Sequence, residues 1–146
     1  MQTIEVSEQL FSEGTVLMPW QPGPRHDLAG PVFLSVTDFL AASKEEVRRI
    51  YETGMELGKT WPVMQGAVGL WLWGRPVERR GGSITVWESE RDMRRFVRWP
   101  VHGAIVREWR GKVRLGTDSW QADRFEPARV LERARDTLGQ PHRSLT

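Results

Sequence analysis

The clearest alternation of polar and apolar residues lies at residues 83–88, where Ile, Val, Thr and Trp predominate. That pattern predicts a strand with one buried face. Ser89 follows, three residues before Asp92, and its hydroxyl can accept hydrogen bonds from the first free amides of a helix. The negative charge of Asp92 stabilises the positive N-terminal end of the same helix. Apolar residues at helical spacing then define one face of this helix: Met93, Phe96 and Val97. We therefore expect a strand and a helix that lies back across the same sheet.

Three more segments have the composition of strands: residues 31–39, 64–73 and 112–125. The first two carry apolar residues on both faces, so both of their faces are expected to be covered. In the second, the alternation places Trp71 and Trp73 on one face. A basic stretch, GRPVERRGG, joins it to the next strand and is expected to be a long hairpin loop.

Two other helices are indicated by their ends. Ser43 and Glu46 form a capping box before an apolar stripe at helical spacing. Pro127 and Gly139 bound a short, arginine-rich C-terminal helix. Pro100 interrupts the helix described first, because it lacks an amide donor and disfavours a helical conformation in the residue before it. We expect that helix to be kinked or split there.

From residue 31 the predicted order is strand, helix, strand, strand, helix, strand, with an extra C-terminal helix. A split βαβ arrangement folds this order into a four-stranded antiparallel sheet with both helices on one face, the α+β fold called ferredoxin-like. The other face would then be bare and apolar, so we expect a second copy to cover it and form a homodimer. We divide the chain into an N-terminal arm (1–30), one domain (31–125) and a C-terminal helix and tail (126–146).

Composition narrows the class of protein. A length of 146 residues suits one domain, and the net charge of +2 comes from arginines interleaved with acids, so no nucleic-acid partner is implied. The absence of cysteine excludes disulfides and thiolate metal sites. No stretch approaches the ~18 apolar residues of a membrane span. With no charged leader before an apolar core, we expect a soluble, cytoplasmic protein without a membrane partner.

The stretch TVWESERDMRRFVRWPVHGAIVREWR resembles the signature of the dimeric α+β barrel superfamily. That superfamily includes the antibiotic biosynthesis monooxygenases, the spheroidene monooxygenase type proteins and the small bacterial haem-degrading monooxygenases. In these families a strand ends in an aromatic residue and a Glu-Ser turn, and the following helix carries Phe, then a small residue or Pro, then His. The matching positions here are Trp87, Glu88, Ser89, Phe96, Pro100 and His102. The resemblance implies a monooxygenase-like oxidoreductase of specialised metabolism.

The resemblance implies two alternatives for His102. In the haem-degrading members a His on this helix is the axial iron ligand and a Trp at the end of the third strand presses on the porphyrin, which gives those roles to His102 and Trp87. Their functional Asn has no counterpart, because the first predicted strand offers only Ser35, Thr37 and Asp38. In the cofactor-independent members, an aromatic substrate lies between helices and sheet and reacts with oxygen directly.

We therefore expect a small-molecule tailoring enzyme that acts on a flat, hydrophobic or aromatic substrate, with no cofactor and no nonhaem metal, and with haem as the alternative. Trp71, Trp73 and Trp87 are expected to form one aromatic wall of the pocket, with Phe96 as a further substrate contact. His102, turned inward after the break at Pro100, is the expected catalytic acid or base. Two other interpretations stay open: these side chains only fill the core or lie at the surface, or the protein is a dimeric binding module without chemistry.

One more cluster is visible in the pattern of charges. Arg91, Arg94, Arg95 and Arg98 form an arginine face on the helix after Ser89. Such a face is most often solvated and paired with neighbouring acids. The alternative is that it binds an acidic ligand or carrier domain.

Overall fold

The computed structural model describes residues 14–142, which contain six strands and four α-helices. From residue 31 onward the elements follow the predicted order, with the second predicted helix divided into two. The domain runs β3 (Val32–Ala41), α1 (Lys44–Gly58), β4 (Ala67–Arg75), β5 (Arg80–Trp87), α2 (Glu90–Arg98), α3 (Pro100–Trp109), β6 (Val113–Ala122) and α4 (Pro127–Leu138). Two short strands, β1 (Val16–Leu17) and β2 (Gln21–Pro22), precede it, and the 3₁₀ turns are η2 (Trp61–Val63) and η3 (Pro76–Glu78).

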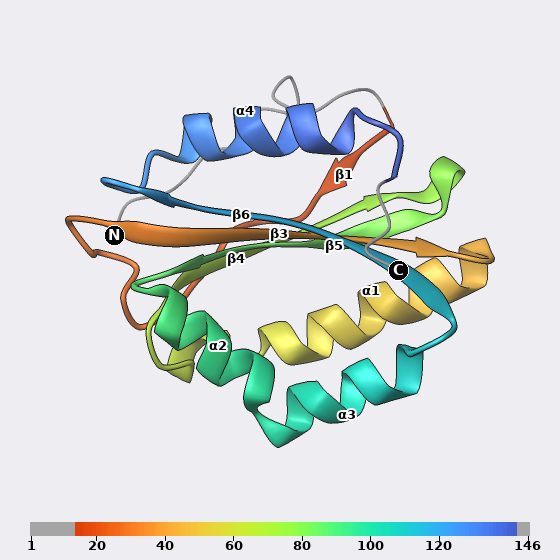
Figure 1. The fold of residues 1–146 in the computed structure, drawn as a ribbon, viewed down its shortest axis with the longest axis horizontal. Helices are drawn as coiled ribbons and strands as arrows, with labels where there is room; N and C mark the ends of the chain where they lie inside the picture. The colour runs from red at the N-terminus through yellow and green to blue at the C-terminus, as the bar shows by residue number, and fades with distance from the viewer. Residues whose placement is uncertain (1–13, 143–146) are drawn as a thin grey trace.

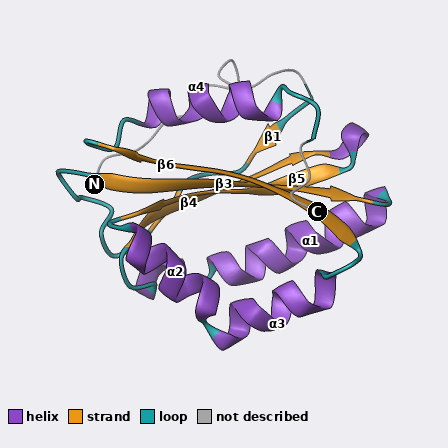
Figure 2. Cartoon of the chain, in the orientation of Figure 1, coloured by secondary structure: helices purple, strands orange, loops and turns teal. Residues whose placement is uncertain are grey.

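The strands form one antiparallel sheet in the order β1-β4-β5-β3-β6, with β2 also paired to β4. The four long strands have the ferredoxin-like arrangement, which confirms the predicted α+β fold. Figures 1 and 2 show α1, α2 and α3 against one face of the sheet and α4 against the other. The central strand β3 is buried on both faces, as its continuous apolar run predicts.

The helix-side face of the sheet carries one of two apolar clusters. The helix α1 lies on this side, and Ser43 caps it: the hydroxyl accepts a hydrogen bond from the Glu46 amide at 3.2 Å, which confirms the Ser43 half of the predicted capping box. The buried members of the cluster come mainly from the sheet and η2: Phe33, Trp61, Ala67, Leu70, Leu72 and Trp87. Side chains of α1 and α2 pack over them, so this layer joins the two helices to the sheet.

The opposite face, expected to be bare, is covered by the chain's own α4 (Figure 1). The buried residues of α4 are spaced along one side of the helix: Val130, Leu131, Ala134 and Leu138. They pack on apolar side chains of β3, β4 and β5, among them Leu34, Trp71 and Ile84. The bare-face argument for a homodimer was therefore wrong, because an amphipathic helix within the chain buries that surface. The homodimer itself stays a prediction.

The described part of the N-terminal arm, residues 14–30, packs on the same molecule. β1 and β2 lie along the edge strand β4, and Trp20 reaches over the sheet to contact Trp71 and Phe125, with ring centroids 4.3 and 5.1 Å away. Gly69 makes room for this indole, since a Cβ there would lie 1.9 Å from the Trp20 ring. Residues 1–13 lie outside the described part.

The connection between β4 and β5 is a tight hairpin, and the long loop predicted there was wrong. The strands extend to Arg75 and Arg80, which pair with each other, and the turn between them is η3. Arg79 closes the turn in the left-handed region, with φ 57°. Hydrogen bonding between β4 and β5 thus extends both strands into a glycine-rich sequence, which local propensity alone would assign to a loop.

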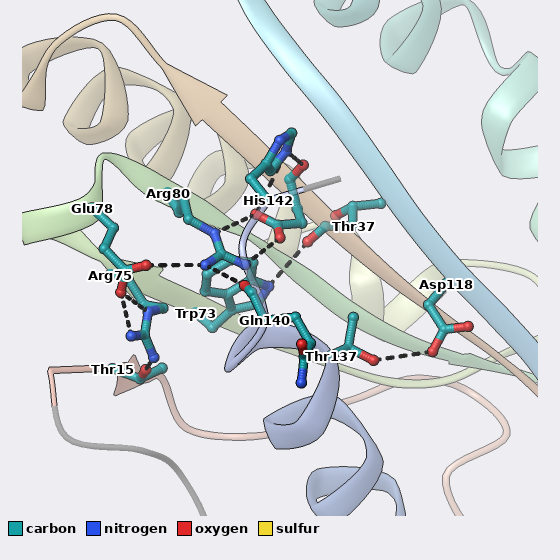
Figure 3. A network of polar contacts seen from close by, with 11 residues as sticks. Thr15, Thr37, Trp73, Arg75, Glu78, Arg80, Asp118, Thr137, Gln140 and His142 are labelled. Carbon is teal, nitrogen blue, oxygen red and sulfur yellow. Dashed lines mark hydrogen bonds and ion pairs between the residues drawn. The ribbon is translucent and has the colours of Figure 1, made fainter. Parts of the chain in front are cut away.

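A buried polar network holds the end of α4 to this hairpin (Figure 3). Arg80, 2% exposed, donates to both carboxylate oxygens of Asp38 at 3.2 and 2.6 Å. It also donates to Glu78 and to the backbone carbonyl of Gln140, each at 3.1 Å. His142 lies 2.9 Å from the Asp38 carbonyl. The buried guanidinium thus makes four hydrogen bonds and is paired with two carboxylates, and residues after α4 are held to β3 and β5.

Candidate functional site

The five residues predicted for the site lie on two opposite faces of the sheet. Trp71 and Trp73 belong to the α4 side, whereas Trp87 belongs to the helix side. The expected single wall of three tryptophans was therefore wrong. The cause is the register, which pairs Trp71 with Ile84 and so places it with the even-numbered residues of β5. Alternation along one strand does not reveal its register against the next.

A bulge in β4 is a second reason why the faces of this strand differ from the prediction. The register of β4 against β5 shifts between Ala67 and Gly69, so Ala67 faces the helices with Leu70, while Val68 faces α4 with Trp71. The extra residue reverses the alternation that the sequence predicts for this strand.

The structure does bring Trp87, Phe96 and His102 together on the helix side. Phe96, on α2, lies between the other two: its ring centroid is 5.4 Å from that of Trp87 and 4.5 Å from that of His102. Trp61 of η2 contacts both Trp87 and Phe96, at 5.2 and 5.3 Å. We call Trp61, Trp87, Phe96 and His102 the aromatic stack. Trp61 was not predicted as a member, since only tertiary packing places it there.

The predicted break at Pro100 positions His102. Trp99 is extended between the two helices, with ψ 131°, and Pro100 starts α3 at its first position. His102 is half-buried, and its Nδ1 lies 3.2 Å from the Val97 carbonyl oxygen. The imidazole is turned inward after the break, as expected, and there it contacts Phe96. Val106, four residues further along the same helix, is 42% exposed.

The ionisation of His102 is set mainly by its burial. Partial removal from water lowers the pKa of His102 below its ordinary value of 6.5, and the hydrogen bond to Val97 acts in the opposite direction. The carbonyl can only accept, so in this contact Nδ1 carries the proton. The neutral imidazole then keeps a lone pair on Nε2. His102 is therefore suited to accept a proton at neutral pH.

A groove of about 1090 Å³ runs beside the aromatic stack, between α2 and residues 60–65. Apolar side chains contribute to its lining from both sides: Val63, Met64, Phe96 and Trp99. Thr60, Gln65 and the charged residues of α2 complete the wall. Phe96 thus borders the groove and also contacts His102. The groove depends on two segments far apart in sequence, so the sequence pattern did not reveal it.

Gly66 lets these two segments approach each other. Its φ of +77° is in the left-handed region, which favours glycine, and a Cβ there would lie 2.2 Å from Cγ of Asp92. Its carbonyl accepts a hydrogen bond from the Glu88 amide at 2.8 Å. The turn before β4 is therefore held against the start of α2, where Ser89 caps the helix by accepting from the Asp92 amide.

The residues present do not fit the haem alternative with a porphyrin held between His102 and Trp87. The Phe96 ring packs against both side chains, and Trp87 is 0% exposed, so its indole has no free face for a porphyrin. The Trp87 indole N–H is also occupied, donating to Thr85 Oγ1 at 2.9 Å. Within residues 14–142, no group of three or more His, Asp or Glu side chains is placed to hold a metal ion. No helix in that range is long and apolar enough to cross a membrane.

Comparison with known proteins adds to the assignment of the fold. No protein-family model and no curated protein matches the sequence. Among solved structures, a monooxygenase-like protein from Listeria innocua aligns with 84% of this chain and 72% of its own, at TM-score 0.57 and 17% identity. SnoaB from Streptomyces nogalater, a cofactor-independent oxygenase, aligns over 68% of this chain and 99% of its own, at TM-score 0.50 and 18% identity. The chain has the fold of the monooxygenase-like ferredoxin-fold proteins.

A third protein of this monooxygenase-like fold comes from Listeria monocytogenes 4b F2365 and is related to antibiotic biosynthesis monooxygenases. It aligns with 63% of this chain at TM-score 0.50 and 13% identity, and the chain spans 57% of its length. At these identities the likenesses concern the fold. The fold agrees with that of the superfamily that residues 85–110 resemble.

Proposed function

We propose that the protein is a small-molecule tailoring enzyme of the monooxygenase-like type, and that a flat hydrophobic substrate binds in the groove between α2 and residues 60–65. The observation that carries this proposal is the position of Phe96, which borders the groove and contacts His102 at 4.5 Å. A concave site lined by aromatic and apolar side chains, next to a titratable group with a shifted pKa, is the usual form of a catalytic pocket.

His102 acts in this proposal as a base. Its neutral form carries a lone pair on Nε2 while Nδ1 donates to Val97. It accepts a proton from an acidic O–H or C–H of the substrate, and the substrate anion is the electron-rich species that reacts further. Phe96 lines the groove and contacts the imidazole, so the proposal requires the Phe96 ring to move aside for a bound substrate to reach His102. Trp87 and Trp61 pack against the Phe96 ring as members of the aromatic stack.

Support for oxygen chemistry comes from the neighbours in fold. SnoaB is a cofactor-independent oxygenase and the Listeria innocua protein is monooxygenase-like. A reaction without a bound cofactor also agrees with the aromatic stack, which fills the space that a porphyrin between His102 and Trp87 would need. These two points support our proposal that the reaction is of the cofactor-independent type.

The test is a screen of flat aromatic phenols for quenching of tryptophan fluorescence, followed by oxygen uptake with each molecule that binds. For a molecule that is turned over, His102→Gln is expected to lower kcat by about 10²-fold or more and to change KM little, since a base acts on the reacting proton. Phe96→Ala is expected to raise KM. Unchanged turnover in His102→Gln would show that the base lies elsewhere.

A second candidate is a binding module without chemistry, which one observation favours. The cations that line the groove are all guanidinium groups, which do not exchange protons near neutral pH, and its carboxylates, Glu90 and Asp92, are ion-paired with Arg94 and Arg95. If His102 does not reach the ligand, the groove can only bind. Ligands that quench fluorescence and undergo no conversion, with or without oxygen, would favour this function.

A further inference from the structure

We propose that the molecule bound in the groove carries a negatively charged group, which Arg91 and Arg98 bind, so that its chemical class is a flat hydrophobic anion. This inference rests on the proposed function, because it concerns the same groove. It adds the charge of the ligand and the residues that select it.

The first argument for an anionic ligand is the net charge of the residues that line the groove. Four arginines and two carboxylates line it, which leaves an excess of two positive charges. Arg94 pairs with Glu90 at 2.8 Å and Arg95 pairs with Asp92 at 2.7 Å. The guanidinium groups of Arg91 and Arg98 have no ion pair or hydrogen bond with any other residue in the range 14–142. The excess charge is therefore located on these two side chains.

The second step is their geometry. Arg91 and Arg98 are separated by two turns of α2, about 10 Å along the axis, and so lie on the same side of the helix. Phe96 and Trp99, which line the same groove, supply aromatic surface near them. A guanidinium presents a planar fork of donors that matches a carboxylate, sulfonate or phosphate. An aromatic body on this surface can therefore place an acidic substituent at one or both arginines.

The shape of the site favours a small molecule over an acidic protein surface. The groove holds about 1090 Å³, the scale of a small-molecule pocket, and its aromatic side chains contact a flat ring better than a polar acidic surface does. Both arginines are exposed, so the attraction is expected to be moderate and to weaken as salt is added.

The test uses two probes that differ in one charged group: 1-anilinonaphthalene-8-sulfonate and its neutral analogue N-phenyl-1-naphthylamine. Their fluorescence is titrated with wild type, with the double variant Arg91→Gln/Arg98→Gln and with the control Arg107→Gln/Arg110→Gln. The control removes the same two charges from exposed arginines of α3 and its C-cap, outside the groove. Melting temperatures confirm that each variant is folded.

We expect wild type to bind the sulfonate more tightly than the neutral probe, and the Arg91/Arg98 variant to bind the sulfonate about tenfold more weakly. Its affinity for the neutral probe is expected to change less than twofold, as is the affinity of the control variant for both probes. Equal losses in the two double variants would mean a nonspecific effect of net charge and would overturn the proposal. If wild type binds both probes equally and neither variant changes this, the anion proposal fails, but the proposal that the groove binds a flat hydrophobic molecule is retained. If wild type binds neither probe, the proposed function fails as well.

Discussion

The imidazole of His102 packs on the ring of Phe96 with their centroids 4.5 Å apart, and the same Phe96 ring borders the groove beside α2. This contact joins the only histidine of α3 to the wall of the groove. It depends on the break at Pro100, because a continuous helix would turn His102 away from Phe96. The candidate site is thus assembled by one proline and one aromatic side chain.

The pKa of His102 gives the first prediction. Since burial lowers it below 6.5, the folded state binds a proton less readily than the unfolded state. The contribution of His102 to stability is therefore present above pH 6.5 and is lost as the pH falls through the folded pKa. Titration of the imidazole signals by NMR is expected to give a His102 pKa below 6.5. The unfolding free energy of His102→Gln should depend less on pH between about 7 and 5 than that of wild type; equal dependence would contradict the assigned burial.

The second prediction concerns haem. Because Phe96 separates His102 from Trp87, addition of hemin is expected to give no sharp Soret band that depends on His102. The measurement is an absorption spectrum of wild type and His102→Ala with equal amounts of hemin. A sharp band in wild type that disappears in the variant would make His102 an axial ligand and reject the cofactor-independent proposal.

Gly66 allows a matched pair of substitutions. Gly66→Ala forces a side chain into a left-handed conformation and against Asp92, so we expect a loss of at least about 1–2 kcal/mol in unfolding free energy. Gly103→Ala, inside α3, meets its nearest atom at 3.5 Å and is expected to be neutral or to add about 0.5–1 kcal/mol. Urea unfolding measures both. Equal effects at the two positions would mean that the turn before β4 is not held as the structure shows.

The cover formed by α4 is tested at Leu131, which is buried against the sheet. Leu131→Ala is expected to lower the unfolding free energy by about 2–5 kcal/mol, through lost burial and the cavity left behind. Glu132→Ala, one residue away and exposed, is the control and should change it by less than about 0.5 kcal/mol. If both variants unfold at the same urea concentration as wild type, α4 does not pack on this face.

Much of the fold follows from local signals, and the parts that do not are long-range. Ser43, Ser89 and Pro100 mark helix ends by their own chemistry, and the structure has helix boundaries at all three. The register of β4 against β5 is set by the whole sheet, so the faces of Trp71 and Trp87 could not be derived from alternation alone.

The C-terminal helix shows the same limit. Its apolar side was visible in the sequence, but which surface it covers depends on long-range contacts, among them the hydrogen bond from Arg80 to the Gln140 carbonyl just after the helix. The groove was missed for a related reason, since residues 60–65 meet α2 only in the folded chain. Of the candidate site, the sequence identified Trp87, Phe96, His102 and the arginine face, and did not identify Gly66 or Trp61.

The most direct test of the central claim is to follow the tryptophan indole signals in ¹H–¹⁵N NMR spectra during titration with 1-anilinonaphthalene-8-sulfonate. Trp99 lines the groove beside α2, whereas Trp20 and Trp71 lie together on the α4 side of the sheet. The account predicts that the Trp99 signal shifts in a saturable way while the Trp20 and Trp71 signals stay in place. Saturable shifts of Trp20 and Trp71 with an unchanged Trp99 would place the ligand under α4 and contradict it.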